Sequence, residues 1–281
     1  MKKIVILYHA ECPDGFGGAW AAWKKFGDTA DYIGVYHNKP APDGIEGKEV
    51  YMVDFVYPLE TTKELIAKNK RVTAIDHHIS SKEVAKMTEN YSYAVNNSGS
   101  VLSWIYFHPD KPVPKLLAYI EDRDLFKWNV LGSEAICAFV DSFDYDFLIW
   151  DKLAGDLENE KGRVEYFDKG SIILKYQEEL IQEFENGAKL VKFEGYDVYV
   201  ANAPHEFASR LGNNLAIKKP PIAIVWSEDK KGVSVSLRSS DENIDVSKIA
   251  EKFGGGGHKM AAGFKLPIIK IFPWEDLDKN E

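Results

Sequence analysis

The chain has 281 residues, of which 45% are hydrophobic and 28% are charged. These proportions are typical of a globular protein, so they exclude disorder, collagen and coiled coil as the main class. The formal net charge is -9. This argues against a broad groove for long nucleic acid, because phosphate contacts need clustered Lys and Arg. A small phosphorylated ligand or a metal ion remains compatible with the charge.

The first half of the chain alternates short apolar runs with helical patterns. The strand-like runs are residues 4–8 (IVILY), 49–56 (EVYMVDFV) and 71–75 (RVTAI), and the helical patterns cover 16–26, 58–69, 98–107 and 113–121. Strands separated by helices indicate right-handed crossovers between parallel neighbours. We therefore expect an α/β fold with a doubly wound, mainly parallel sheet.

The sequence pattern of the second half of the chain changes twice, first to helical and then to strand-like. From about residue 133 the pattern is helical, until Asn186-Gly187 gives a typical helix stop. A predicted hairpin then turns at Glu194-Gly195 and alternating strands follow. We expect residues 1–185 to form the α/β domain with its connecting helices, and residues 186–281 a smaller α+β domain.

No apolar run approaches the roughly 18 residues that a membrane span needs. The start, MKK followed by IVILY, is too short for a secretory signal. The two cysteines, Cys12 and Cys137, lack the CxxC and Cys/His spacings of zinc sites. We therefore expect a cytoplasmic protein with reduced thiols and no membrane partner.

Acidic and imidazole side chains follow the predicted strands and the later helix. They are His9, Glu11 and Asp14 after the first strand, Asp54 at the second, Asp76, His77 and His78 at the third, and Asp122 and Asp124 after the helix. Because strand ends of an open α/β sheet share one crevice, we expect these side chains to converge. Each alone could be an ordinary loop residue. The whole set predicts a metal site.

The donor types narrow the choice of metal. Imidazole nitrogen and carboxylate oxygen without thiolate suit Mn²⁺, Mg²⁺ or Fe²⁺ better than structural zinc. Two ions about 3.5–4 Å apart can share a carboxylate, hold a hydroxide and clamp a phosphate. Without such ions, clustered carboxylates would repel one another.

A glycine-rich segment lies near the C-terminal end, at residues 253–264 (FGGGGHKMAAGF). Its glycines can take positive φ at little cost, so their N–H groups could converge on an anion. An adjacent histidine and an arginine at the end of an alternating strand could also donate to a phosphate. A hairpin tip is the alternative interpretation. The candidate substrate-binding residues are Arg238, Gly255, Gly256, Gly257 and His258.

These motifs resemble those of the DHH phosphoesterase family. Asp76-His77-His78 after an apolar strand is similar to the family's eponymous motif. Residues 9–15 (HAECPDG) resemble its first motif, Asp54 in VDFVYP its second and Asp122 in IEDRD its fourth. Residues 253–264 resemble the glycine-rich motif of the DHH-associated C-terminal domain. The resemblance covers nearly the whole chain, in the family's order.

The resemblance implies a two-domain phosphoesterase with Mn²⁺ on the N-terminal domain and substrate held by the glycine-rich domain. Two ions are expected, with Mg²⁺, Co²⁺ or Fe²⁺ as alternatives to Mn²⁺. The implied metal ligands are His9, Asp14, Asp54, His77 and Asp122, with Asp54 as the bridging candidate.

The resemblance also implies catalytic roles for two residues of the DHH motif. Asp76 would ligate the metal or orient its neighbours, and His78 would face the substrate phosphate. Relatives usually have Asp where Glu11 stands. Glu11 is therefore a metal-ligand candidate with a longer side chain than the family pattern. The choice between Asp122 and Asp124 also stays open.

Taken together, the sequence predicts Mn²⁺-dependent hydrolysis of phosphodiester or phosphomonoester bonds by a metal-bridging hydroxide. The expected substrates are nanoRNA, linear or cyclic dinucleotides, or phosphoadenosine phosphate. One alternative is an inorganic polyphosphate or pyrophosphate hydrolase, and another is a nucleotide-binding sensor without catalysis. The expected partner is a small nucleotide or short oligonucleotide, not long nucleic acid. A homodimer is left open.

Overall fold

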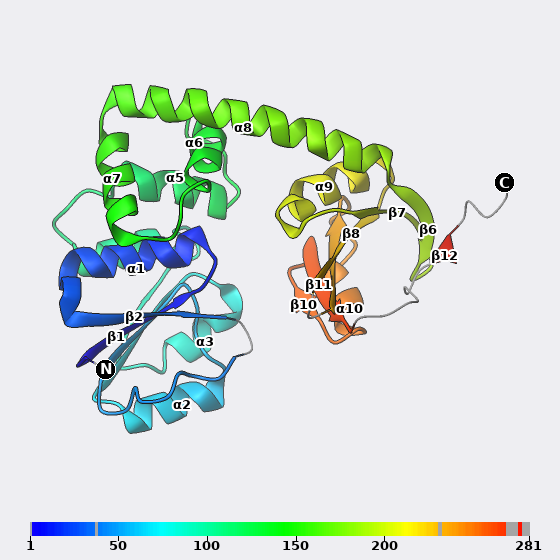
Figure 1. Cartoon of the computed structure of the whole chain (residues 1–281). Coiled ribbons are helices and arrows are strands. Elements are labelled where there is room, and N and C mark those ends of the chain that lie inside the picture. The colour runs from blue at the N-terminus through cyan, green and yellow to red at the C-terminus, as the bar shows by residue number, and fades with distance from the viewer. Residues whose placement is uncertain (1, 37–38, 230–231, 268–274, 277–281) are drawn as a thin grey trace. The chain divides into compact units, whose positions relative to one another are not determined.

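The computed structural model describes residues 2–36, 39–229, 232–267 and 275–276. The chain divides into two compact units, Met1–Leu174 and Lys175–Glu281 (Figure 1). The division falls inside the long helix α8 (Glu160–Asn186), whereas the sequence interpretation placed a boundary at the end of this helix. Helix α8 thus contributes residues to both units.

The described residues of the N-terminal unit contain a five-stranded sheet in which all paired strands run parallel. In spatial order the strands are β2 (Ala30–Val35), β1 (Ile4–His9), β3 (Glu49–Val53), β4 (Arg71–Asp76) and β5 (Asn90–Tyr93). This is the expected α/β sheet. The edge strands β2 and β5 are additions that the apolar pattern did not predict.

Helices cover both faces of this sheet. Their bounds are α1 (Pro13–Phe26), η1 (Gly27–Thr29), α2 (Leu59–Lys68), η2 (Ile79–Ser81), α3 (Lys82–Ala85), α4 (Gly99–Phe107) and α5 (Lys115–Asp124). Successive strand residues point to opposite faces. Ile6 therefore packs with Trp20 of α1 in one core, while Val5 packs with Leu65 of α2 in another. The sheet is doubly wound, as predicted.

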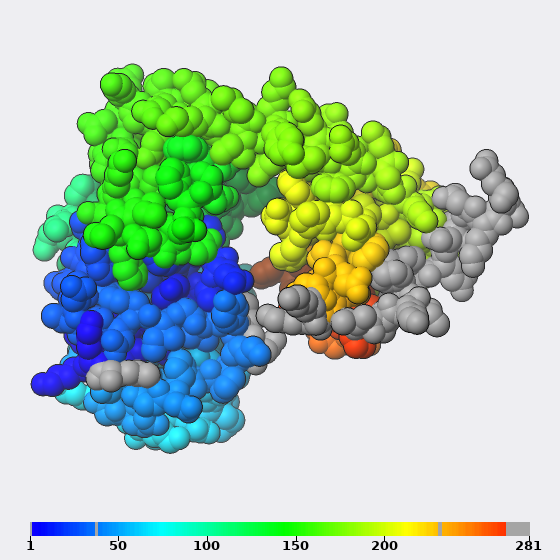
Figure 2. Space-filling view, viewed as in Figure 1, coloured from blue at the N-terminus to red at the C-terminus, as the bar shows by residue number. Residues whose placement is uncertain are grey.

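Two further helices, α6 (Ser133–Val140) and α7 (Phe147–Glu158), pack against α5, and α7 also packs against α1. The first part of α8 lies against these two helices, where Tyr166 contacts Phe139 and Asp156. Figure 2 shows them as a continuous green layer over the blue residues. Phe147 of α7 stacks on Phe16 and Trp23 of α1, with ring centroids 4.9 Å and 5.5 Å apart. This packing fixes α1, whose first turn carries part of the site described below.

The C-terminal unit has a mixed sheet, seven-stranded over the described residues. In spatial order its strands are β10 (Gly256–Gly257), β11 (Ala261–Leu266), β9 (Gly232–Ser239), β8 (Ile222–Asp229), β7 (Tyr196–Asn202), β6 (Lys189–Phe193) and β12 (Glu275–Asp276). Only β7 and β8 pair in parallel among these. The predicted hairpin is confirmed: Glu194 and Gly195 turn between β6 and β7 with φ of 49° and 85°.

The C-terminal helices lie on opposite faces of their sheet. They are η3 (His205–Phe207) with α9 (Ala208–Lys218), and α10 (Val246–Glu251). Leu211 and Leu215 of α9 share a core with Val225, while Ile249 of α10 shares another with Leu237. This is the expected α+β arrangement. None of the helices in the described ranges combines the length and hydropathy required to cross a membrane.

A buried histidine gives the N-terminal unit a pH dependence. The Nε2 atom of His108, just after α4, lies 2.9 Å from the carbonyl oxygen of Ala21. Burial lowers the pKa of His108 below its ordinary value. The unfolded chain would bind a proton near pH 6.5, which the folded unit resists. We therefore expect the free energy of unfolding to decline as the pH falls below about 6.5.

Denaturant unfolding between pH 5 and 8 would measure this decline, and His108→Gln should flatten it. An NMR titration of His108 provides the direct check, since the folded protein should show a pKa below 6.5. A measured pKa at or above that value would contradict the prediction.

Candidate metal centre

The carboxyl ends of three adjacent strands bring the predicted residues together. His9 is the last residue of β1, Asp54 follows β3 directly, and Asp76 is the last residue of β4. Strands β1, β3 and β4 are neighbours in the sheet. Asp54 has a φ of 61°, and its N–H donates to the carbonyl oxygen of Ile75, 2.9 Å away. The backbone thereby bends out of the sheet where its carboxylate is needed.

His77 lies at the centre of the cluster. Its Nε2 atom is 3.3 Å from Asp54 Oδ1 and 3.5 Å from Asp124 Oδ2. The distance from the same nitrogen to Asp14 Oδ2 is 3.9 Å. One imidazole nitrogen therefore faces three carboxylates, of which Asp14 and Asp54 are fully buried. Such a concentration of charge out of water needs a compensating cation.

Asp14 is held in place by the start of another helix. It stands in the first turn of α1, and its carboxylate accepts hydrogen bonds from the N–H groups of Gly99 (2.6 Å) and Ser100 (3.0 Å). These are unpaired amides of the first turn of α4, where a negative charge is favoured. A side chain at Gly99 would not fit, because its Cβ would lie 2.7 Å from Asp54 Cβ.

Asp76 orients both histidines that follow it. Its Oδ1 atom accepts from the His77 N–H at 2.8 Å and the His78 N–H at 3.3 Å, and it lies 2.7 Å from His78 Nδ1. The hydrogen bond to Asp76 raises the pKa of His78. His78 Nδ1 therefore serves as the donor and the ring is fixed through it.

A second group of potential metal ligands lies on the β1 side of Asp54. His9 Nδ1 is 3.3 Å from Asp54 Oδ2. Ligand atoms of His9, Cys12 and Asp54 all lie within 4.8 Å of one another. Burial, and then the charge of Asp54, raise the pKa of the Cys12 thiol. Cys12 is therefore a poor thiolate donor beside a good imidazole and carboxylate pair. Sequence spacing gave no signal for its presence here.

The pKa shifts describe the repulsion within the cluster. Burial and the neighbouring Asp54 charge raise the pKa values of Asp14 and Asp124. Burial acts to raise the pKa of Asp54 as well, but the imidazoles of His77 and His9 hold it below its ordinary value. Burial acts to lower the pKa of His77, but the Asp54 and Asp124 carboxylates raise it to about 9. A divalent cation would relieve the same repulsion.

Three buried side-chain atoms are suited to bind a metal ion directly. Among the described residues, Asp54 Oδ1, Asp76 Oδ2 and His77 Nε2 are buried without a hydrogen-bond partner. Buried polar atoms are normally paired, so unpaired ones at one point need another partner. Oxygen and imidazole nitrogen are ligands of Mn²⁺, Mg²⁺ and Fe²⁺. The residues present therefore fit divalent ions bound across Asp54.

One predicted ligand must be corrected. Asp122 is buried, but its Oδ1 accepts from the Asn129 N–H (2.8 Å), and its Oδ2 from the Val130 N–H (3.1 Å) and the Ser133 hydroxyl (2.5 Å). Both oxygens hold the loop after α5. Asp124 takes the place at His77 instead. Residues two apart on a helix point in nearly opposite directions, so only one can join the cluster.

Glu11 also lies outside the cluster of potential ligands in the described chain. It is exposed, has a φ of 55°, and accepts a hydrogen bond from the Tyr36 hydroxyl at 2.9 Å. Its carboxylate is thus directed to the end of β2. Glu11 therefore contacts Tyr36 next to the metal centre and is not one of the clustered ligands.

The glycine-rich segment of the C-terminal unit forms a hairpin. The N–H groups of Gly254 and Gly255 donate to the carbonyls of Glu251 and Ala250. These two N–H groups are therefore not directed at an anion, in contrast to the nest that the sequence suggested. A side chain at Gly255 or Gly257 would collide with β11, its Cβ lying 2.1 Å from Gly263 O and 2.6 Å from Ala262 Cα respectively. These glycines allow the close pairing of β10 with β11.

The remaining substrate-binding candidates flank this hairpin. A Cβ added at Gly256 would have no atom within 4 Å, and His258 is exposed in the turn, where its N–H donates to Ala261 O. Ala261 in turn pairs with Arg238 of β9. The Arg238 guanidinium donates to Leu237 O (2.9 Å) and Ser209 Oγ (2.8 Å). Arg238 and His258 thus lie at one end of the same sheet.

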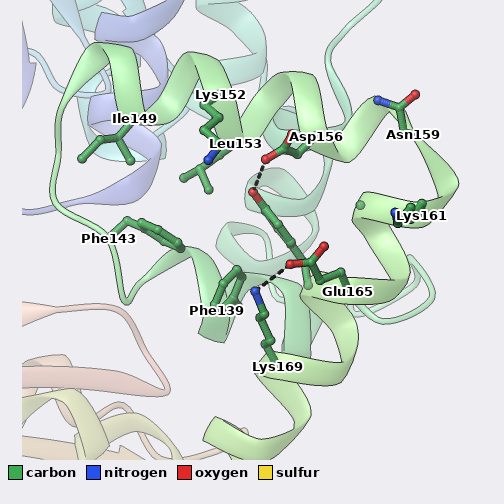
Figure 3. A pocket seen from close by; sticks show the side chains of 12 residues that line it. Phe139, Phe143, Ile149, Lys152, Leu153, Asp156, Asn159, Lys161, Glu165 and Lys169 are labelled. Carbon is green, nitrogen blue, oxygen red and sulfur yellow. Dashed lines mark hydrogen bonds and ion pairs between the residues drawn. The ribbon is translucent and has the colours of Figure 1, made fainter.

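A separate pocket of about 740 Å³ lies among α6, α7 and α8. Figure 3 shows its acidic residues already engaged: Glu165 pairs with Lys169 at 2.6 Å, and Asp156 accepts from the Tyr166 hydroxyl at 2.8 Å. The rest of its lining is mainly apolar or lysine. The described residues that line it include no histidine and no unpaired carboxylate cluster, so this pocket is not the metal centre.

Comparison with known proteins relates both units of the chain to other proteins. The DHHA1 domain model matches residues 200–279. The chain is 33% identical over 306 residues to the uncharacterised protein R106 of Acanthamoeba polyphaga mimivirus, covering 98% of this chain and 70% of that protein. It is 32% identical over 130 residues to the oligoribonuclease NrnB of Bacillus subtilis (strain 168), covering 46% of this chain and 26% of NrnB. The match thus spans about a quarter of NrnB.

Solved structures share the fold. The DHH domain of a protein described as a member of a family of ribosomal proteins superimposes with a TM-score of 0.61 at 15% identity, covering 94% of this chain and 82% of that one. The pGpG-specific phosphodiesterase PggH of Vibrio cholerae gives 0.52 at 14% identity, covering 95% and 94%. RecJ of Thermus thermophilus, in complex with Mn²⁺, gives 0.51 at 14% identity, covering 94% and 49%.

The DHH motif stands at the carboxyl end of β4, the cluster around it has the donors of a divalent-metal site, and the DHHA1 model matches the C-terminal unit. The chain therefore belongs to the DHH family and carries its DHHA1 domain.

Proposed function

We propose that this protein is a Mn²⁺-dependent phosphoesterase that hydrolyses phosphodiester or phosphomonoester bonds of short nucleotides. One observation carries the proposal: a single imidazole nitrogen of His77 lies within 4 Å of three carboxylates from three different segments. The chain's net charge of -9 favours short substrates over long polyanions. NrnB, an oligoribonuclease, and PggH, a pGpG-specific phosphodiesterase, act on the same class of substrate, which supports the proposal.

The proposed metal ligands are His9, Asp14, Asp54, His77 and Asp124, with the free oxygen of Asp76 available as a further donor. When bound, two divalent ions would activate water and neutralise phosphate charge. Mn²⁺ is proposed from among the ions that imidazole and carboxylate donors suit, namely Mn²⁺, Mg²⁺ and Fe²⁺. The raised pKa of the Cys12 thiol beside them disfavours a thiolate-bound metal. RecJ, which shares the fold, is described in complex with Mn²⁺.

The chain's own residues would supply orientation and charge. Asp76 fixes the rings of the DHH motif, and His78, whose pKa is raised by that contact, could present a positive charge to a phosphate oxygen. Asp14 would be kept in register by the amides of α4. In the C-terminal unit, Arg238 and His258 are the proposed phosphate contacts.

The compartment proposed for this activity is the cytoplasm. Cys12 and Cys137 are both free thiols. Reduced thiols are typical of cytoplasmic proteins, although they do not define the compartment alone.

A substrate panel tests the proposal directly. Chelated protein, before and after addition of Mn²⁺, would be incubated with a 5′-phosphorylated RNA dinucleotide, cyclic di-AMP, phosphoadenosine phosphate, pyrophosphate and tripolyphosphate. We expect Mn²⁺-dependent release of mononucleotide or phosphate from nucleotides. Cleavage of the inorganic substrates alone would indicate a polyphosphate hydrolase. Metal binding without turnover of any substrate would indicate a sensor and reject the enzymatic proposal.

A further inference from the structure

The loop that follows Asp124 is unusual in conformation and in composition. Phe126 and Trp128 have φ of 52° and 50°, a region that bulky L residues rarely adopt. Their side chains are nevertheless turned outward, 68% and 37% exposed. Two strained, exposed aromatic residues beside a cluster of metal ligands point to a functional role, because strain of this kind concentrates at ligand sites.

The loop is held rigidly at its start. The Asp122 carbonyl accepts from the N–H groups of Lys127 (2.8 Å) and Trp128 (3.4 Å). The Asp122 carboxylate accepts from those of Asn129 and Val130, and from a serine hydroxyl beyond them. A buried carboxylate thus fixes the course of an exposed loop. This explains why Asp122, and not only Asp124, is acidic.

The loop is also held at its end. Gly132 has a φ of 76°, and a Cβ there would lie 2.8 Å from Cδ2 of Phe167 on α8. The loop therefore closes against the helix layer described above. Held at both ends, the rings of Phe126 and Trp128 keep a defined arrangement, with centroids 5.7 Å apart and planes at 74°. A preordered surface loses little entropy when it binds a ligand.

The chemistry of the loop favours a flat, uncharged group. Its one cation, Lys127, donates to Asn96 O at 3.0 Å and lies 4.0 Å from Glu121. The ammonium group of Lys127 is therefore already paired within the protein and is not directed at a phosphate. Phe126 follows Asp124 by two residues, so their Cα atoms lie within about 7 Å. That span is comparable to the separation of base and phosphate in a nucleotide.

We propose that the Phe126–Trp128 loop is a nucleobase-stacking platform beside the metal centre, with Asp122 as its positioning residue. The inference rests on the proposed function, since it assumes that the cleaved phosphate sits at the Asp54 cluster. It adds that recognition of the base occurs within the N-terminal unit. Stacking on aromatic rings is tolerant of base identity, so the platform separates nucleotides from inorganic phosphates rather than one base from another.

The test compares two substrates and four proteins. The substrates are a 5′-phosphorylated diadenylate and its abasic counterpart, which has the same sugar-phosphate backbone without bases. The proteins are the wild type, Phe126→Leu, Trp128→Leu, and the control Leu131→Ala, whose side chain is 94% exposed on the same loop. Turnover is measured with Mn²⁺, binding with Ca²⁺ in its place, and folding by thermal unfolding.

We expect the wild type to favour the diadenylate in kcat/KM and Kd by about tenfold or more. Phe126→Leu and Trp128→Leu should remove this preference, mainly through KM, and should affect the abasic substrate little. Leu131→Ala should behave as the wild type. Equal losses on both substrates, or no loss at all, in the leucine variants would overturn the inference.

The two proposals fail in different ways. Binding of the diadenylate without turnover of it or of any substrate in the panel above would reject the proposed function, and the leucine variants would still decide the inference through Kd. Turnover that is indifferent to the bases would reject the platform and retain the phosphoesterase. A wild type that neither binds nor cleaves the diadenylate or any nucleotide of that panel would reject both.

Discussion

Asp54→Asn is expected to lower kcat on a nucleotide substrate on the order of 10³-fold, because Asp54 offers an oxygen to each of the two donor groups. Asparagine preserves the shape of the side chain and tolerates the positive φ of this position. The loss would therefore report on charge and ligation rather than on misfolding. Steady-state kinetics at saturating Mn²⁺, together with calorimetric measurement of Mn²⁺ binding, would provide the evidence.

A matched pair of variants sharpens this prediction. Asp124→Asn should show a loss comparable to that of Asp54→Asn, because its carboxylate faces His77. Asp122→Asn should retain more kcat but unfold more easily, by about 1–3 kcal/mol, since its carboxylate satisfies buried donors. If Asp122→Asn instead abolished Mn²⁺ binding while Asp124→Asn did not, the assignment of ligands given above would be wrong.

Gly170→Ala should destabilise the N-terminal unit by about 2–3 kcal/mol, although alanine normally favours a helix. Gly170 lies on α8 where that helix crosses α6, and a Cβ would stand 1.7 Å from the carbonyl oxygen of Ala135. A backbone oxygen cannot move aside as a flexible side chain can. The two helices would have to separate, which would expose part of the core beneath them.

Gly155→Ala is the control for Gly170→Ala. It lies within α7 with no atom within 4 Å of the added Cβ, so the same substitution should stabilise by about 0.4–1 kcal/mol. Urea unfolding can be followed through the fluorescence of Trp20 and Trp150, which are buried in this unit. Equal effects of the two substitutions would show that the helix crossing is looser than the structure indicates.

The central part of the fold and site could be predicted because local and global signals agree there. Strands β1, β3 and β4 are buried on both faces, so they appear in the sequence as apolar runs. The polar residues that end these runs are then forced to one edge of the sheet. His9, Asp54 and His77 could be grouped from this arrangement without knowledge of any distance.

The edge strands could not be recognised in the same way. In β2 the four middle residues are only half-buried, and in β5 no residue is fully buried. Their sequences therefore lack the apolar run that marks the central strands. Pairing with β1 and β4 holds them in the sheet, and this is a tertiary effect that the local pattern does not contain.

The choice between Asp122 and Asp124 stayed open in the sequence for a different reason. Leu117 and Tyr119, on different sides of α5, are both buried, so the apolar pattern does not show which side faces the cluster. Deciding would have required knowledge of the loop whose amides Asp122 accepts. The glycine-rich segment was similarly ambiguous, because glycine permits both an anion nest and the close hairpin of β10 and β11.

The positive φ of Asp54 has a consequence for the mutational history of this position. The ligand cluster requires a carboxylate at position 54. The chain direction after β3 requires a left-handed backbone conformation at the same residue. Most replacements would be penalised on both grounds, whereas asparagine and glycine would incur only the chemical penalty. An inactive descendant of this protein would therefore be expected to pass through one of those two residues at position 54 before reaching any other.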